Sequence, residues 1–560
     1  MKKVFIAIVA ILLCFTGASA NRADGKIRIN IVLKAQSDVM ELSRMADAFP
    51  TKAERRLFVV NVLKQQAKES QIDLMNYLNA LEINGVVEDV RPLWIVNSVS
   101  CYAEESVMDA IARRNDVMTV YQCVEFSCLD DDATIPVECG EGREIAENVT
   151  MVNAHLVWEL GYTGEDVLVA LIDTGVRLDH ADLQGRLWDG GPEYPNHGYD
   201  FYSHDNDPSD THGHGTYVAG TIVGSGASGT NTGVAPGAKI MALKVFHGED
   251  NLTEPTMWVE AMQFAVEHGA DVLNMSLGQP LPDSGVKFML RQTCDNTLAA
   301  GVVAAVCAGN SRQIQMLAPV PYNIWSPGDC PPPHLHEDQM VNAGGTSCVI
   351  CVGAVDFNDV IGGFSSEGPS TWSDVAQYND YPYSSGSASN IGLIRPDVCA
   401  PGVNIKSLDW NTTNGYCLKS GTSMATPCVA GTIALMLSKD HELTPAQIDE
   451  ILERTTIPLS AHKSNDFGSG RIDAFAAVND VGDDGVDEID SNIKIYPNPT
   501  NDILNIKVEG IKNVIVVNSL GQIVCETVEN QIDLSQYGNG IFILRIETEN
   551  GICLQRIVVM

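Results

Sequence analysis

Long apolar runs and basic side chains are both scarce in this sequence of 560 residues. After the first twenty residues, no stretch of eighteen or more apolar residues is free of charge, so no membrane-spanning helix is expected there. Lysine and arginine together number 35 against 72 aspartates and glutamates, which gives a formal net charge of −37. Because nucleic acids and anionic lipids are bound by clustered basic side chains, we expect neither as a partner.

Internal repeats and paired metal-binding motifs are also missing from the sequence. Cys348 and Cys351 form one C-x-x-C, but no second such motif and no nearby pair of histidines completes a tetrahedral zinc site. The two cysteines lie in an apolar run at 348–353, which predicts a buried strand. We therefore expect no metal or redox role for this motif. The fifteen cysteines show no repeating spacing, so the sequence predicts no particular disulfide pairing.

Residues 1–20 have the composition of a secretory signal peptide. A short basic start precedes an apolar run at 4–15, and residues 18–20 are small, as a cleavage site requires. Cys14 raises the alternative of lipid attachment, but Leu13 stands where the bacterial lipid-attachment motif needs a small residue. We expect soluble export through the periplasm, a route that permits disulfides.

Residues 27–128 predict a small α+β domain of the split βαβ type. Its expected elements are strands at 27–33, 93–99 and 117–121 and an amphipathic helix at 104–112. The following stretch, 129–147, is acidic and has no periodicity, which predicts a linker.

Residues 148–479 alternate apolar, β-rich runs with helical ones, which favours a doubly wound α/β domain with a mostly parallel sheet. The runs that predict buried strands are 167–172, 239–245, 272–275 and 302–308. Residues 481–490 are rich in aspartate and glycine and predict a flexible joint. Residues 491–560 carry short strands separated by turn signals, which predicts a small all-β sandwich.

Ser423 is the first candidate for chemistry. A serine hydroxyl becomes a nucleophile only when a base takes its proton. Pro427 and the apolar run at 430–437 predict a helix that begins just after Ser423. The free N–H groups and positive dipole of a helix N-terminus would stabilise an oxyanion that forms there.

A base and a carboxylate are present at compatible places. His212 and His214 precede an apolar run that predicts a helix start, and imidazole is the usual base near neutral pH. Asp173 ends the strand predicted at 167–172, and ligands of doubly wound sheets lie beyond the carboxyl ends of the strands. A carboxylate there can orient the imidazole. Asn310 also follows a strand end, where its amide could donate to the oxyanion.

These motifs resemble the active-site signatures of the subtilisin-like serine peptidases. The matching segments are Asp173-Thr174-Gly175, His214-Gly215-Thr216 and Gly421-Thr422-Ser423-Met424-Ala425-Thr426-Pro427, in the family's Asp, His, Ser order. The resemblance implies a catalytic triad of Asp173, His214 and Ser423 with His212 outside it. It also implies Asn310 in the oxyanion hole and substrate binding by the segment Ser276-Leu277-Gly278.

The same resemblance implies roles for the flanking regions. Residues 27–128 resemble the inhibitory prodomain of these peptidases, with a cut expected between Leu129 and Thr150. Residues 491–560 resemble the type IX secretion sorting domain of certain Gram-negative bacteria. The expected partners are protein or peptide substrates, the chain's own prodomain and the type IX secretion machinery. The expected location is secreted or at the outer cell surface.

No cofactor is expected for the chemistry, although a structural calcium ion remains an alternative. Asp182 matches a position that ligates calcium in some family members, but no second ligand is evident and a plain aspartate there is at least as good an interpretation. The stretch 311–345 is longer than the family minimum, and no function follows from its sequence.

Two functions of other classes stay open at this point. One is a catalytically silent adhesin that keeps the fold, since a fold does not dictate function. The other is a metal-dependent hydrolase that uses His212 and His214 with His334 or His336. The complete triad motif favours the peptidase: a secreted serine endopeptidase that acts through an acyl-enzyme on Ser423 and is made as an autoinhibited precursor.

Overall fold

The computed structural model describes residues 25–559, except positions 130–134, 138–143, 249, 336–338, 340–344, 373–374, 376–391, 483–493, 498–499, 501–502, 509, 519–522 and 549–550. The chain divides into two compact units between Val478 and Asn479. The predicted signal peptide and most of the predicted joint at 481–490 lie outside the described residues.

The first part of the larger unit is a four-stranded antiparallel sheet with helices, here called the N-terminal domain (residues 27–123). Its elements are β1 (Ile27–Leu33), α2 (Val39–Ala46), α3 (Lys52–Ser70), α4 (Ile72–Ile83), β2 (Val87–Leu93), β3 (Ser98–Ala103), α5 (Glu105–Ala112) and β4 (Val117–Gln122). The strand order β2-β3-β1-β4 agrees with the split βαβ pattern. Helix α3 begins in a capping box, in which Thr51 and Glu54 bond to each other's backbone N–H groups.

The predicted linker at 129–147 contains two short strands. β5 (Ile135–Val137) pairs with β18 (Gly415–Lys419), and β6 (Glu144–Ile145) pairs with β9 (Thr230–Asn231). Strands of two or three residues are too short to show a period of two in the sequence, which is why the pattern predicted only a linker.

The centre of the larger unit is a seven-stranded sheet in the order β16-β15-β12-β11-β7-β10-β8, in which every pair is parallel. The strands are β7 (Leu168–Asp173), β8 (Gly198–Asp200), β10 (Lys239–Lys244), β11 (Val272–Met275), β12 (Val303–Cys307), β15 (Val349–Val355) and β16 (Val398–Pro401). Residues of β11, β12 and β15 are buried throughout, because helices cover both faces of the sheet. The doubly wound α/β fold predicted from the sequence is confirmed.

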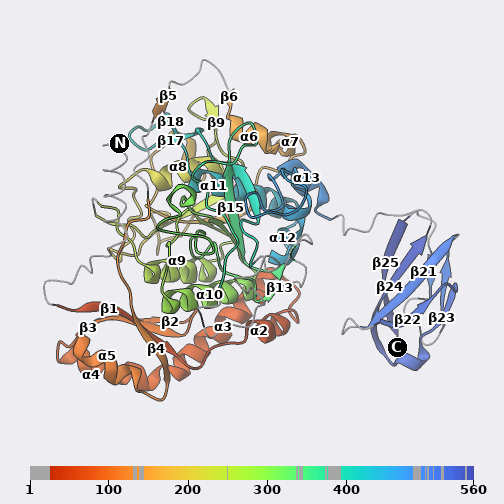
Figure 1. Cartoon of the computed structure of the whole chain (residues 1–560), viewed down its shortest axis with the longest axis horizontal. Helices are drawn as coiled ribbons and strands as arrows, with labels where there is room; N and C mark the ends of the chain where they lie inside the picture. Colours follow the sequence, from red (N-terminus) through yellow and green to blue (C-terminus); the bar gives the residue numbers. More distant parts are fainter. Residues whose placement is uncertain are drawn as a thin grey trace. The chain divides into compact units, whose positions relative to one another are not determined.

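The helices around this sheet divide into two groups. Helices α9 (Pro255–Glu267) and α10 (Ser284–Ala299) lie toward the N-terminal domain, where α9 packs on α3 and α10 packs on α2 (Figure 1). Helices α8 (His214–Val223) and α11 (Thr422–Lys439) pack against each other and against β7. The remaining elements are α6 (Glu147–Met151), α7 (Ala154–Glu159), the 3-10 turn η1 (Ala181–Leu183), β17 (Ile405–Asp409), α12 (Pro445–Arg454) and α13 (Ala474–Asp480).

The smaller unit is all-β, as predicted. Its sheets are β19-β20-β23 and β22-β21-β24-β25, with antiparallel pairing throughout. The strands are β19 (Lys494–Tyr496), β20 (Ile503–Lys507), β21 (Ile511–Asn518), β22 (Ile523–Thr527), β23 (Gln531–Asp533), β24 (Gly540–Thr548) and β25 (Gly551–Val559). Their buried leucine, isoleucine and valine side chains form one apolar core. None of the helices described for the chain is long and apolar enough to cross a membrane.

Candidate active site

Three elements of the catalytic sheet region each bring one predicted triad residue to the same edge of the sheet. Asp173 is the last residue of β7, His214 is the first residue of α8, and Ser423 is the second residue of α11. Because α8 and α11 pack on each other and on β7, residues that are 250 positions apart in the chain become neighbours. All three are buried, and Ser423 is the most accessible of them at 9% exposure.

The aspartate and the histidine form a direct pair. Nδ1 of His214 lies 2.8 Å from Oδ1 and 3.1 Å from Oδ2 of Asp173. The backbone N–H of Thr174 donates to the same Oδ1 at 2.7 Å. A carboxylate held on Nδ1 sets the tautomer in which Nε2 of the ring carries the lone pair, so Nε2 is the basic nitrogen.

The glycine after the histidine makes this close approach feasible. A Cβ atom on Gly215 would lie 2.1 Å from the carbonyl oxygen of Gly175 and 3.1 Å from Oδ1 of Asp173. Any side chain here would push α8 away from the end of β7, so the G in the H-G-T motif is a requirement of packing.

Asp210 is a supporting residue that the sequence motifs did not reveal. Its Oδ1 accepts hydrogen bonds from the backbone N–H groups of His212 and Gly213 at 2.9 and 2.8 Å, and from the Thr174 hydroxyl at 2.9 Å. Its Oδ2 accepts the N–H of Thr216 at 2.9 Å. One carboxylate therefore ties the loop before α8 to the end of β7. An aspartate just before a helix start is a signal that could have identified it.

Ser423 and Ser276 bond to each other reciprocally. The Ser423 hydroxyl donates to the carbonyl of Ser276 at 3.0 Å, and the Ser276 hydroxyl donates to the carbonyl of Ser423 at 2.9 Å. Ser276, Leu277 and Gly278 follow directly after β11, so the predicted substrate-binding segment lies against the start of α11. In this structure the Ser423 hydroxyl therefore has the Ser276 carbonyl as its hydrogen-bond acceptor.

Asn310 lies on the other side of the serine, three residues after β12 ends. Its side-chain oxygen accepts the N–H of Thr422 at 3.1 Å and the Thr422 hydroxyl at 3.0 Å. With its oxygen held this way, the amide presents its nitrogen beside Gly421, where a Cβ would lie 3.7 Å from Nδ2. The predicted oxyanion donor is thus oriented by the residue that precedes Ser423.

His212 lies near the Asp173–His214 pair. Among the described contacts, Nδ1 of His214 and not the His212 ring bonds to the Asp173 carboxylate. Its ring centroid is 6.4 Å from that of His214, and burial lowers the pKa of its imidazole. Among the described residues, no group of three or more His, Cys, Asp or Glu side chains is placed to hold a metal ion. His336 and the side chain of His334 lie outside what the structure describes. Cys348 directly precedes β15 and Cys351 lies within it, and both are buried thiols.

Asp182 is fully buried in η1, and protein donors use both of its oxygens. Oδ1 accepts the N–H of Ser228 at 2.6 Å, and Oδ2 accepts the Tyr416 hydroxyl at 2.7 Å. This arrangement of neutral donors does not fit a calcium site, which needs several oxygen ligands that converge on one point. Asp182 instead joins three segments of the chain by hydrogen bonds.

Comparison with known proteins agrees with this geometry. Residues 164–490 match the model of the subtilase family. The chain belongs to the subtilase family. It is therefore a serine-type peptidase by family, and the resemblance seen in the sequence is confirmed. Residues 494–560 match a second family model, the secretion system C-terminal sorting domain. In the sequence of this subtilase, a sorting domain therefore follows the catalytic domain.

Several curated proteins are similar over long stretches. Bacillopeptidase F of Bacillus subtilis (strain 168) is 30% identical over 483 residues, which cover 81% of this chain but only 30% of that protein. Serine protease AprX of the same strain is 29% identical over 418 residues, 68% of this chain and 80% of AprX. Subtilisin E, also from that strain, is 32% identical over 337 residues, 60% of this chain and 72% of its own length. The subtilase thus spans less than a third of the first of these relatives.

Proposed function

We propose that this subtilase is a secreted endopeptidase that hydrolyses peptide bonds through an acyl-enzyme on Ser423 and is made as an autoinhibited precursor. The observation that carries the proposal is the 2.8 Å contact between His214 and Asp173 at the sheet edge where α11 presents Ser423. A buried carboxylate that orients an imidazole beside a serine is the arrangement that activates a hydroxyl nucleophile.

In the acylation step, Oγ of Ser423 attacks the carbonyl carbon of the scissile bond. His214 takes the hydroxyl proton on Nε2, and Asp173 stabilises the imidazolium that results. The C–N bond then breaks, and the imidazolium gives its proton to the departing amine. The acyl group stays on Ser423 as an ester.

In the deacylation step, water replaces the amine. His214 takes a proton from the water while the water oxygen attacks the ester carbonyl. The C–Oγ bond breaks, Ser423 regains its proton from His214, and the acid product leaves. In both steps the negative oxygen of the tetrahedral intermediate accepts hydrogen bonds from the Asn310 amide and from the backbone N–H of Ser423 at the start of α11. Only side chains and backbone of this chain take part, so we propose that the chemistry needs no metal.

The autoinhibited precursor is supported by the way the N-terminal domain docks on the catalytic domain. The two share one continuous apolar core, to which α3 contributes Val59 and Leu63 and α9 contributes Trp258. The exit from the domain then runs along the catalytic domain, where Phe126 pairs with Thr253 through two backbone hydrogen bonds of 3.0 and 2.9 Å. A chain held in this strand-like way along the catalytic domain has the extended conformation of a bound peptide.

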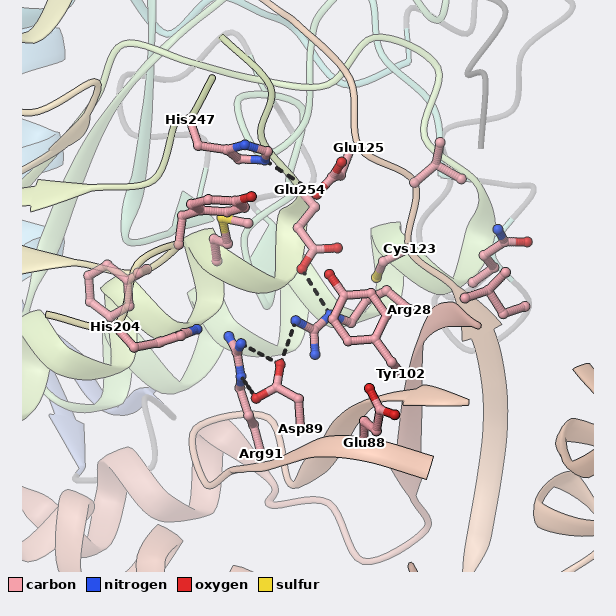
Figure 2. Close-up of a pocket in the computed structure, with 16 residues that line it drawn as sticks. Arg28, Glu88, Asp89, Arg91, Tyr102, Cys123, Glu125, His204, His247 and Glu254 are labelled. Carbon is pink, nitrogen blue, oxygen red and sulfur yellow. Dashed lines mark hydrogen bonds and ion pairs between the residues drawn. The ribbon is translucent and has the colours of Figure 1, made fainter. Parts of the chain in front are cut away.

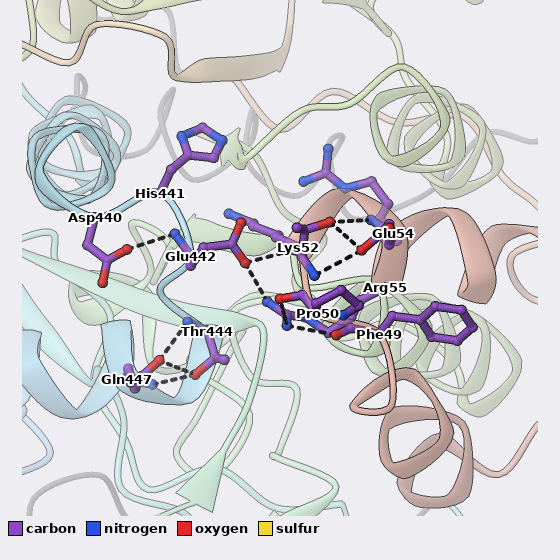
Figure 3. A network of polar contacts seen from close by, with 12 residues as sticks. Phe49, Pro50, Lys52, Glu54, Arg55, Asp440, His441, Glu442, Thr444 and Gln447 are labelled. Atoms are coloured by element: carbon purple, nitrogen blue, oxygen red, sulfur yellow. Dashed lines mark hydrogen bonds and ion pairs between the residues drawn. The ribbon is translucent and has the colours of Figure 1, made fainter.

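Charge also supports this docking, because six ion pairs among the described residues have the Lys or Arg on the N-terminal domain and the acid on the catalytic domain. Around the start of α3, Arg55 lies 2.9 Å from Glu442, whose carboxylate also accepts the N–H of Lys52 at 2.8 Å (Figure 3). Lys52 lies 3.5 Å and Arg56 lies 3.4 Å from Asp271.

A second set of charged groups lines a cavity of about 610 Å³ between the two domains (Figure 2). Arg28 lies 3.3 Å from Glu254, and Arg91 lies 3.3 Å from Glu260 on α9. Release of the N-terminal domain would break these ion pairs and open the shared apolar core, so the docked precursor is expected to separate only after the connecting segment is cut.

Export is the remaining part of the proposal. The sorting domain at 494–560 supports passage through a type IX system to the cell surface or the medium, with protein or peptide substrates met outside the cell. An N-terminal inhibitor fits this route, because the peptidase would stay inactive until it leaves the cell that makes it.

The replacement Ser423→Ala tests the proposal. We expect the variant to lose hydrolysis of casein, labelling by a serine-directed phosphonate and trimming of its own N-terminal domain. A Ser423→Ala protein that still hydrolyses casein at the wild-type rate would contradict the proposal. A control variant, Ser438→Ala near the other end of α11, is expected to keep all three properties.

A further inference from the structure

The stretch 311–345, which no catalytic step uses, places one large side chain directly beside the active site. Trp325 belongs to this stretch and is 8% exposed. Its backbone N–H donates to the carbonyl of Ala308 at 3.0 Å, and its neighbour Ser326 pairs with Gln279 through hydrogen bonds of 2.8 and 3.0 Å. Trp325 is therefore tied to the chain just after β12 and to the chain just after β11.

Two glycines show how tightly the indole lies between these segments. A Cβ added to Gly309 would lie 2.5 Å from Cδ1 and Cγ of the indole. A Cβ added to Gly278 would lie 2.9 Å from Cβ of Trp325 and 3.6 Å from its Cε3. Since the distances of 2.5 Å and 2.9 Å are shorter than contacts that real Cβ atoms make, both glycines lie directly against Trp325, which occupies the space between them.

That space is where the substrate side chain must go. The reacting carbonyl has to lie between Ser423 Oγ and the Asn310 amide, and the side chain of the same substrate residue is attached only two bonds from that carbonyl carbon. Gly309 directly precedes Asn310, and Gly278 is two residues from Ser276, which bonds to Ser423. The two segments that enclose Trp325 are thus the ones that flank the expected position of the scissile carbonyl.

The indole cannot swing out of the space between these segments without losing several contacts. Its Nε1 donates to the hydroxyl of Ser311 at 2.7 Å, and Ser311 is fully buried. Asn323 donates to the Ser311 carbonyl at 3.0 Å, which holds the acceptor in place. A side chain fixed at both ends is a rigid wall and does not act as a mobile gate.

We propose that Trp325 forms the floor of a shallow specificity pocket and restricts the enzyme to substrates with a small side chain (glycine, alanine or serine) on the acyl side of the cleaved bond. This inference rests on the proposed peptidase function of the same site. A large apolar side chain would have to displace a fixed indole, whereas an alanine methyl group needs no such change. Discrimination of about tenfold or more is expected, since each excluded group in a pocket typically changes kcat/KM by that factor.

The test uses the secreted, mature protein with blocked tetrapeptide 4-nitroanilides that differ only in their last residue, Ala or Phe. We expect the wild-type kcat/KM to be about tenfold or more higher for Ala than for Phe. In Trp325→Gly, the Phe-to-Ala ratio is expected to rise about tenfold or more, because removal of the indole opens the space between the two segments. Trp325→Val serves as a second variant with a smaller opening if the glycine variant does not fold.

Trp188→Ala is the matched control, because this half-buried tryptophan belongs to an aromatic cluster with Tyr194 and Phe264 and not to the active site. This variant should keep the wild-type ratio of kcat/KM between the Phe and Ala substrates. Titration of Ser423 with a phosphonate counts the active molecules in every sample.

A wild-type protein that labels at Ser423 but cleaves the Phe substrate as fast as the Ala substrate overturns this inference and leaves the peptidase standing. An unchanged ratio in both Trp325 variants also overturns it. A protein that neither labels nor hydrolyses either substrate overturns both the inference and the proposed function.

Discussion

Asn310 has the oxygen of its side-chain amide held by Thr422. Thr422 holds the side-chain oxygen with two hydrogen bonds, and this directs the nitrogen to the side where the oxyanion would form. A donor that is oriented before the reaction costs no reorganisation in the transition state, which is why single oxyanion donors have large effects on turnover.

We therefore expect Asn310→Ala to lower kcat by about 10²–10³-fold with little change in KM, because the amide bonds to the oxyanion and not to the ground-state carbonyl. Steady-state hydrolysis of a peptide 4-nitroanilide measures both constants. Asn358→Ala removes an exposed asparagine elsewhere and should leave them unchanged. A fall of less than about tenfold for Asn310→Ala would argue against its assigned role.

Asp210 is expected to act by positioning His214 and not by contact with the substrate. It accepts hydrogen bonds from four residues of the segments that carry Asp173 and His214. We expect Asp210→Ala to lower kcat by about tenfold or more and to destabilise the protein by about 2–4 kcal/mol, since several hydrogen bonds to a charged acceptor are lost. Asp210→Asn keeps one acceptor oxygen, so it should recover part of the lost kcat and part of the lost stability. Thermal unfolding and kcat give the two readouts, and equal values for the two variants would contradict this interpretation.

At the scale of elements, helix α3 connects the N-terminal domain to the catalytic domain through charges of different burial. Lys52 and Asp271 are both 4% exposed, whereas the Arg55 and Glu442 side chains are 22% and 50% exposed. Although burial alone would raise it, the hydrogen bond from His441 and the charges of Lys52 and Arg56 hold the pKa of Asp271 below its usual range. Solvent screens the outer pair but not the inner one.

Loss of the inner cation should therefore matter more than loss of the outer one. In a Ser423→Ala precursor, which cannot trim itself, we expect Lys52→Met to lower the free energy of unfolding by about 2 kcal/mol and Arg55→Met by about 0.5 kcal/mol. Denaturant titration followed by tryptophan fluorescence measures both. Arg44→Met, which removes an exposed cation of α2, is the control and should have no effect. An equal loss for the two α3 variants would show that burial does not decide their contribution.

At the scale of the whole molecule, the cavity between the N-terminal and catalytic domains is lined by a buried acid, Glu254, whose protonation depends on docking. Burial raises the pKa of Glu254 to about 7, against the opposing charge of Arg28. A carboxyl group with a raised pKa binds more protons in the docked state than when it is exposed. Its contribution to stability is thus complete below its ordinary pKa and is lost as the pH rises through about 7.

We expect Glu254 to contribute a loss of stability to the docked Ser423→Ala precursor between pH 5 and pH 8, the interval in which this residue loses its proton. Glu254→Gln, a neutral side chain of the same shape, should make the dependence on pH shallower. The hydrogen bond to Asp271 raises the pKa of His441, which acts in the same direction, so His441→Asn is the variant that separates the two contributions. Thermal unfolding at a series of pH values is the measurement, and an unchanged slope in Glu254→Gln would contradict the prediction.

Local patterns in the sequence were enough to predict the parallel sheet and the family. The runs before Asp173 and Asn310 are buried strands because both faces of the sheet are covered, and such strands leave a continuous apolar signature. The glycines and the helix start around His214 and Ser423 are equally local, since they follow from how a backbone turns and begins a helix.

Tertiary structure alone decided which side chains from distant segments meet. Asp210, the Tyr416 hydroxyl on Asp182 and the position of Trp325 between Gly278 and Gly309 depend on contacts between segments that no periodic pattern relates. Hydrogen bonds and packing distances of this kind are set by how elements stack, and the sequence records only the elements. The physical reason is that periodicity reports which face of an element is buried but not what it is buried against.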